Sequence, residues 1–180
     1  HKRYDFSYVT PDNPSGETAD LILIATKQTG LLDALDQIER NVGPDTLVLP
    51  LQNGILSEEM VAARYGWDRT LYAFVYGNGL LTAEGYICPK PGKIVFGEKD
   101  NTVLTDRVKA IQDFLNRVGV HFESPTDMRR AQWSKFVLNV GINQAAGVLR
   151  AHFGDFQCSP KSLAICRGLM EEAAQVAEAQ

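Results

Sequence analysis

The stretch Asp20-Leu21-Ile22-Leu23-Ile24-Ala25-Thr26 decides how this chain folds. A continuous apolar run of this length predicts a strand that is buried on both faces of a parallel sheet. Outward from it, the pattern predicts a helix over 31–41, a second strand over 46–51, and a helix that begins at Ser57 with first-turn acids. The order strand, helix, strand, helix is typical of a parallel α/β unit.

The rest of the chain extends this unit and then changes character. The sequence predicts a short strand over 6–9, a strand pair over 71–77 and 93–97, an amphipathic helix over 102–117 and a strand over 120–123. From about residue 127 onward the pattern is helical only. The predicted fold class is therefore α/β, with an incomplete Rossmann-type sheet over 1–124 followed by a truncated all-α domain over 125–180.

Composition excludes several classes of function. The 180 residues are 44% hydrophobic and 22% charged, with a net charge of −4, which argues against nucleic acid or an anionic membrane as a partner. No apolar run approaches the roughly 20 residues of a membrane span, and no signal peptide is visible. Three scattered cysteines and three histidines lack metal-ligand spacing. We expect reduced thiols, no metal and a cytoplasmic protein.

One predicted helix carries an unusual row of polar side chains. Lys135, Asn139 and Asn143 follow one another in steps of four, which keeps them on one helical face. Their neighbours are mostly apolar, so the helix is predicted to be buried nearly all round. A partly desolvated lysine is suited to proton transfer near neutral pH. The alternative is an ordinary solvated face.

Polar residues also follow the first two predicted strands. An α/β sheet binds ligands at the carboxyl ends of its strands. Lys27 stands after the first strand and could donate to a phosphate, ribose or carboxylate oxygen. Asn53 and Gly54 stand after the second strand, where an amide could bind a ligand and a glycine lets the backbone approach it. The alternative is an exposed loop and a simple Asn-Gly turn.

Three motifs in this order resemble the ketopantoate reductase (2-dehydropantoate 2-reductase) family. They are the strand that ends in Lys27-Gln28, the segment Leu51-Gln52-Asn53-Gly54, and the helix Trp133-x-Lys135-x-x-x-Asn139-x-x-x-Asn143. The resemblance implies that NADP(H) lies on the Rossmann domain and a 2-keto acid lies between the domains. It makes Lys135 the general acid, Asn139 and Asn143 substrate ligands, and Lys27, Asn53 and Gly54 cofactor ligands.

The resemblance implies reduction of 2-dehydropantoate to pantoate for coenzyme A biosynthesis. The apolar helical domain suggests a homodimer as a hypothesis. The sequence departs from the family at one motif, because the Gly-x-Gly-x-x-Gly loop of the Rossmann fold is absent. The residue that selects NADP over NAD is therefore not visible. Two alternatives stay open: a related hydroxyacid dehydrogenase with another substrate, and a non-catalytic nucleotide-sensing protein on the same fold.

Overall fold

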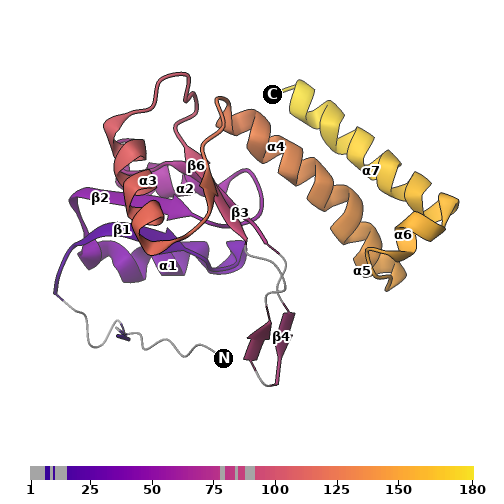
Figure 1. Ribbon diagram of the computed structural model, residues 1–180, viewed down its shortest axis with the longest axis horizontal. Coiled ribbons are helices and arrows are strands. Elements are labelled where there is room, and N and C mark those ends of the chain that lie inside the picture. The colour runs from indigo at the N-terminus through magenta and orange to yellow at the C-terminus, as the bar shows by residue number, and fades with distance from the viewer. Residues whose placement is uncertain (1–6, 9, 11–15, 78–79, 84, 88–91) are drawn as a thin grey trace.

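A computed structural model describes residues 7–8, 10, 16–77, 80–83, 85–87 and 92–180. In this part of the chain an α/β layer is followed by a group of helices that stands beside it (Figure 1). The predicted strand over 6–9 begins and ends on residues outside the described ranges. The predicted fold class, a parallel α/β sheet followed by helices, is confirmed.

The first part of the sheet is the predicted α/β unit. Strand β1 (Ala19–Ile24) pairs in parallel with β2 (Val42–Pro50), and the connection between them contains α1 (Leu31–Ile38). Helix α2 (Ser57–Tyr65) follows β2. A hydrophobic core forms between these elements, and its buried members are Ile24, Leu31, Leu35, Val48 and Val61.

One detail of the prediction is wrong. Strand β1 is not buried on both faces: only Ile24 is buried, and Leu23 is exposed. The physical reason is that, among the described residues, β1 has β2 as its only strand partner and lies at the edge of the sheet. An apolar run shows that a strand can be covered, but not which of its neighbours is present.

The sheet continues through β3 (Tyr72–Tyr76), which pairs antiparallel with β6 (Lys93–Gly97). Strand β6 pairs in parallel with β7 (Phe122–Glu123), and β4 (Leu80–Thr82) and β5 (Gly85–Ile87) form a separate hairpin. The predicted strand pair is therefore present. Helix α3 (Asp106–Val118) begins after its N-cap Thr105 and packs on this sheet through three buried side chains, Val108, Ile111 and Leu115.

A parallel bridge between Val48 and Thr70 joins the two parts of the sheet. Val48 donates its N–H to the carbonyl of Arg69 at 2.7 Å and accepts from the N–H of Leu71 at 3.2 Å. Strand β3 therefore continues in the same direction as β1 and β2. The carboxyl ends of all three strands lie at one edge of the sheet, which is where α/β folds bind ligands.

The helical part begins with α4 (Met128–Asn139), capped by the Asp127 side chain. A π-helical turn (Val140–Gln144) separates α4 from α5 (Ala145–Leu149). After α6 (Asp155–Cys158), α7 (Pro160–Glu178) begins at its Ser159 cap and runs back along α4 (Figure 1). The predicted helix to about residue 150 is therefore not one regular helix, since its hydrogen bonds change register in the middle.

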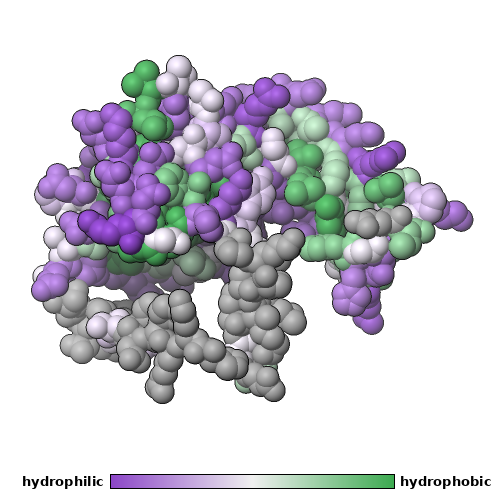
Figure 2. All heavy atoms as spheres, viewed as in Figure 1, coloured by the Kyte–Doolittle hydropathy of each residue, from purple (hydrophilic) through white to green (hydrophobic). Residues whose placement is uncertain are grey.

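Helix α4 and its continuation are covered only in part. Figure 2 shows apolar residues at the surface of the helical part, and Leu138 and Val148 are among the exposed ones. The prediction that this helix is buried nearly all round is wrong, because among the described residues β3 and α7 are the main elements that pack against α4, and Leu138 stays exposed. No helix in the described ranges is both long and apolar enough to cross a membrane.

Candidate functional site

Lys135 is the most unusual charged residue of the helical part. It lies in the middle of α4, and only 8% of its surface is exposed. Its Nζ atom donates a hydrogen bond to the carbonyl oxygen of Val75 on β3, at 2.6 Å. The ammonium also lies 5.0 Å from the ring centroid of Phe74 and 5.5 Å from that of Tyr76. Lys135 therefore reaches from the helical part to the end of a central strand.

Burial changes the chemistry of this lysine. Removal of water from the ammonium lowers the pKa of Lys135 from 10.5 to about 8. Among the described residues no carboxylate pairs with it, so its neighbours are a carbonyl dipole and two aromatic faces, which stabilise a cation weakly. Such a group gives up its proton near neutral pH far more readily than a surface lysine does.

The two asparagines of the row are more open than the lysine. Asn139 is half-buried at the end of α4, and Asn143 is exposed within the π-helical turn. In the described part of the chain neither side chain makes a hydrogen bond, so both carboxamides are free to bind a molecule from solution. Among the described residues, no hydrogen bond joins either asparagine to the Lys135 ammonium, which donates to the carbonyl oxygen of Val75.

The π-helical turn affects this row. In an α-helix each step of four residues overshoots a full turn by about 40°. A π turn is wider, with i→i+5 hydrogen bonds, so the step from Asn139 to Asn143 falls short of a full turn. The two deviations have opposite signs. The π turn therefore keeps Asn143 near the helical face that carries Lys135 and Asn139.

The second candidate region is the pair of loops after β1 and β2. The Gln52 side chain donates to the hydroxyl of Thr26 at 2.9 Å, which ties the two strand ends together. Lys27 and Asn53 are exposed beside this contact. The Oε1 atom of Gln52 is buried and has no hydrogen-bond partner among the described residues. A buried acceptor of this kind is costly unless a donor reaches it.

Gly54 completes this region. Its φ angle of +120° lies in the range that side-chain-bearing residues rarely adopt, so the turn requires glycine. A Cβ atom built at this position would meet no other atom within 4 Å. The backbone is therefore open on that side, and a ligand could approach it closely. The predicted residues Lys27, Asn53 and Gly54 do lie on adjacent loops at one edge of the sheet.

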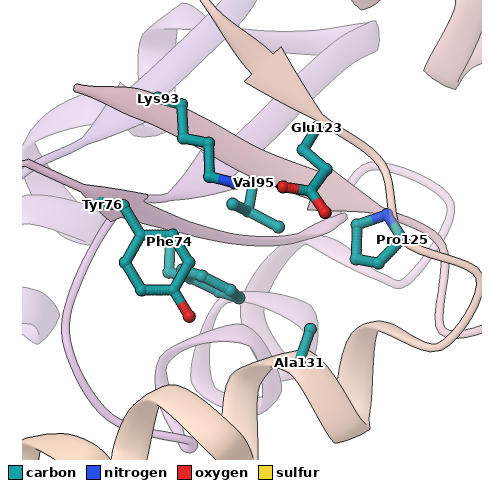
Figure 3. A pocket seen from close by; sticks show the side chains of 7 residues that line it. All are labelled: Phe74, Tyr76, Lys93, Val95, Glu123, Pro125 and Ala131. Atoms are coloured by element: carbon teal, nitrogen blue, oxygen red, sulfur yellow. Dashed lines mark hydrogen bonds and ion pairs between the residues drawn. The ribbon is translucent and has the colours of Figure 1, made fainter. Parts of the chain in front are cut away.

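An open groove of about 420 Å³ lies between the sheet and the start of α4 (Figure 3). Phe74 and Tyr76, the two rings beside Lys135, form part of its wall. Lys93 of β6 and Glu123 of β7 form an ion pair on the sheet side of the groove. The remaining lining residues are Val95, Pro125 and Ala131. Ala131 lies one helical turn before Lys135 on α4, and Lys135 is not among the residues that line the groove.

Sequence reasoning missed the surroundings of Lys135. Phe74 and Tyr76 read as ordinary strand residues, and Val75 acts through its backbone, which no motif reports. Glu58 was expected only as a first-turn acid of a helix, and the structure buries it to 1% exposure. The two acids at 58 and 59 give no sign of this difference, since which one faces inward depends on how α2 sits on the sheet.

Metal ligands are not assembled in the described part of the chain. No three side chains of histidine, cysteine, aspartate or glutamate lie together there in a way that could hold a metal ion. Cys158 and Cys166 are free thiols, and Cys88 lies outside the described residues.

Comparison with known proteins identifies the family. The family model described as ketopantoate reductase PanE/ApbA matches residues 2–101, and the model of its C-terminal domain matches residues 127–180. This chain belongs to the ketopantoate reductase family. The two matches together include every site residue discussed above except the groove residues Glu123 and Pro125.

Individual relatives agree with this assignment. The 2-dehydropantoate 2-reductase of Pyrococcus horikoshii is 26% identical over 169 residues, which is 90% of this chain and 53% of that protein. The structure of 2-dehydropantoate 2-reductase from Geobacter metallireducens is 25% identical with a TM-score of 0.80, over 89% of this chain and 54% of that one. This chain thus spans about half the length of the relatives it matches.

A second structure shows the fold in another enzyme. D-mandelate dehydrogenase with NADH and anilino(oxo)acetate is 19% identical with a TM-score of 0.81, over 92% of this chain and 53% of that one. At this identity the similarity concerns the fold alone. The same architecture therefore occurs with different substrates, and the substrate has to be argued from the site.

Proposed function

We propose that the protein containing this chain is a nicotinamide-dependent 2-keto acid reductase that converts 2-dehydropantoate to pantoate with NADPH. The observation that carries the proposal is Lys135: a desolvated ammonium, fixed by the Val75 carbonyl at the ligand-binding edge of the sheet. Membership of the ketopantoate reductase family supports the same substrate.

The cofactor site is proposed at the ends of β1 and β2. The exposed Lys27 and Asn53 offer donors for ribose or amide oxygens, and Gly54 leaves room for close approach. The unpartnered Gln52 acceptor adds a place for an incoming N–H group. These residues fit the sugar and nicotinamide part of a dinucleotide. When bound, the cofactor supplies a hydride to the carbonyl carbon of the substrate.

Lys135 supplies the proton. As hydride reaches the carbonyl carbon, the C=O π electrons move to the oxygen, and the Lys135 ammonium stabilises that charge and transfers a proton to it. The products are the 2-hydroxy acid, the oxidised cofactor and a neutral lysine that regains a proton from water. A pKa of about 8 suits this role, since the lysine is still mostly protonated at pH 7 but releases its proton easily.

The open asparagines would hold the substrate. Asn139 and Asn143 follow Lys135 along the helix and have unused donors and acceptors. We assign them to the substrate's carboxylate and hydroxyl oxygens, and the π-helical turn keeps them in line with the ammonium. The test is a change in the KM for the keto acid in Asn139→Ala and Asn143→Ala, with the KM for the cofactor unchanged.

The deciding experiment measures cofactor oxidation by the full-length protein. NADPH and NADH are each tested with 2-dehydropantoate and with a panel of other 2-keto acids. We expect turnover with NADPH and 2-dehydropantoate, and a loss of at least about 10²-fold in kcat for Lys135→Ala. Lys109→Ala, an exposed lysine on α3, is the matched control and should keep full activity.

Other outcomes have definite meanings. Turnover only with NADH and an aromatic keto acid would favour the dehydrogenase alternative, whose fold this chain shares. Nucleotide binding without reduction of any keto acid would favour the non-catalytic sensing alternative. Full activity of Lys135→Ala would remove this lysine from the mechanism and leave the proton donor to be found elsewhere.

A homodimer through the helical part belongs to the same proposal. Several large apolar side chains are exposed there, including Val148, Phe153, Ile165 and Val176. Burial of such side chains against a second copy would be favourable. Light scattering of the full-length protein after size exclusion should give twice the monomer mass, and a monomer would refute this part of the proposal.

A further inference from the structure

Glu58 is a buried carboxyl that the proposed mechanism does not use. It lies at the start of α2 and is 1% exposed. One oxygen accepts from the Ser57 hydroxyl at 3.0 Å, and the other accepts from the backbone N–H of Ala73 on β3 at 3.2 Å. Burial raises the pKa of Glu58, and these hydrogen bonds act in the opposite direction. A carboxyl that costs this much to bury needs a reason to be there.

Gln132 of α4 lies against the same carboxyl. Its side chain is 2% exposed and lowers the pKa of Glu58 through a hydrogen-bonding contact. Among the described residues, neither terminal atom of Gln132 has any partner of standard hydrogen-bond geometry. The Gln132 amide therefore lies beside the Glu58 carboxyl without a hydrogen bond of standard geometry. Gln132 stands three residues before Lys135, so both lie on one face of α4.

The backbone of β3 explains why these contacts belong together. Alternate residues of a strand present their N–H and C=O groups to the same edge. Leu71, Ala73 and Val75 therefore share one edge of β3, opposite the edge that pairs with β6. Leu71 donates to Val48 of β2. At Ala73 and Val75 the partners of the β3 backbone are side chains instead of a strand: Glu58 accepts from the N–H of Ala73, and Lys135 donates to the carbonyl of Val75.

Two side-chain contacts follow one another along this edge of β3. At the first contact, Glu58 accepts from the N–H of Ala73 on β3 and lies beside the buried Gln132 side chain of α4. The second contact lies two residues further along the strand and three further along the helix. There Lys135 donates directly to the carbonyl oxygen of Val75. We infer that Glu58 is a positioning residue: it fixes α4 on the free edge of β3 so that the Lys135 ammonium meets the Val75 carbonyl.

This role rests on the proposed function only in that the positioned group is the proposed acid. Glu58 also begins α2 just after the Asn53-Gly54 turn, so it connects the proposed cofactor loop to the proton donor. The other charged groups nearby are Glu59 on α2 and Arg129 on α4, whose Oε1 and Nη1 atoms lie 3.9 Å apart. Tyr72 on β3 is close enough for Arg129, Glu58 and Glu59 to affect its pKa.

The test measures the pKa of Lys135 without requiring catalysis. Trace acetylation of the full-length protein with acetic anhydride, over a range of pH values and read by mass spectrometry, gives the titration of each lysine. In the wild type we expect Lys135 to titrate near its lowered value. In Glu58→Ala, α4 is released and water reaches the ammonium, so this pKa should rise by about one unit or more.

Matched variants separate positioning from stability. Glu58→Gln keeps an acceptor for Ala73 and should leave the Lys135 titration within a few tenths of the wild-type value. Glu59→Ala removes only the long, half-exposed pair with Arg129 and should leave the Lys135 titration within a few tenths of the wild-type value. In the reductase assay, Glu58→Ala should lower kcat about tenfold or more with the cofactor KM unchanged, because the acid is misplaced.

The outcomes are decisive in each direction. A Lys135 titration in Glu58→Ala identical to that of the wild type would overturn the inference. If Glu58→Ala does not fold, Gln132→Met cuts only the link to α4, and an unmoved Lys135 pKa in that variant would overturn it as well. A shifted titration in a protein that reduces no keto acid would keep the positioning role and refute the proposed function.

Discussion

Two lysines stand out in the sequence, and the structure treats them in opposite ways. Lys27 follows β1 and is exposed at the edge of the sheet. Lys135 lies on α4, is almost fully buried, and is held by a backbone carbonyl between two aromatic rings. Both were expected at a ligand site, and burial lowers the pKa of Lys135 to about 8.

The difference follows from what each region is built to do. An exposed lysine in a loop can attract an anionic ligand and adapt to it, and it costs the fold little. A buried lysine is costly in the folded state, since its charge is separated from water and has no counter-ion. The cost is tolerated where function uses a proton that is easily lost. The loops therefore suit binding, and α4 suits chemistry.

The pH dependence of the reaction gives the largest expected difference between the two lysines. Lys135 must carry a proton to act as the acid, so kcat/KM should be constant at lower pH and fall above about pH 8. The loss approaches tenfold for each further pH unit. Lys27→Met should keep this descending limb and mainly raise the KM for the cofactor.

Lys135→Met should lose most of the rate and should also lose the fall of kcat/KM above about pH 8. Initial rates of the full-length protein between pH 6 and 10 test both expectations. A wild-type rate that stays constant up to pH 10 would contradict the assignment. If kcat/KM of Lys135→Met still falls above about pH 8, another group is responsible for this titration.

Sequence predicted the elements well and their surroundings poorly. Apolar runs and caps located β1, β2 and α3, because these signals are local. The partial exposure of β1, the π-helical turn and the burial of Glu58 were not predictable, since each depends on which element packs where. For Lys135, spacing identified the residue and the apolar neighbours suggested burial. The Val75 carbonyl and the Phe74 ring come from a strand 60 residues away.

The glycine in the π-helical turn provides the next test. A Cβ atom at Gly141 would lie 2.3 Å from Cγ of Met170 and 2.9 Å from the carbonyl oxygen of Cys166, both on α7. Gly141→Ala should therefore push α7 away and lower the free energy of unfolding by about 1–3 kcal/mol. Denaturant unfolding measures it.

Gly147 is the matched control, because a Cβ there meets nothing within 4 Å in the same helical segment. Gly147→Ala should be neutral or stabilising by about 0.5–1 kcal/mol. Equal effects of the two substitutions would mean that close packing of α7 does not hold the turn.

Gly54 tests the other region in a different way. Gly54→Ala meets no steric neighbour, but it forces alanine to a φ of +120°, which costs on the order of 1–3 kcal/mol of strain. The turn should relax by moving Asn53, so the affinity for the cofactor should fall, while the decline of kcat/KM above about pH 8 stays unchanged. Isothermal titration with NADPH measures this, and unchanged affinity would remove the turn from the cofactor site.

The smallest expected effect concerns the cost of Lys135 itself. Its folded-state pKa of about 8 lies below the value of about 10.4 in an unfolded chain. Between these values the unfolded chain binds more protons, so the stability of the wild type should rise with pH across that window. Below pH 8 the full free-energy cost of the buried ammonium is present. Lys135→Met removes this cost but leaves the Val75 carbonyl without its donor, which offsets part of the gain.

We expect Lys135→Met to be more stable than wild type by about 1 kcal/mol at pH 7 and to lose this advantage by pH 10. Urea unfolding at both values measures the difference. An advantage that does not depend on pH would mean that side-chain volume, rather than buried charge, distinguishes this position from Lys27.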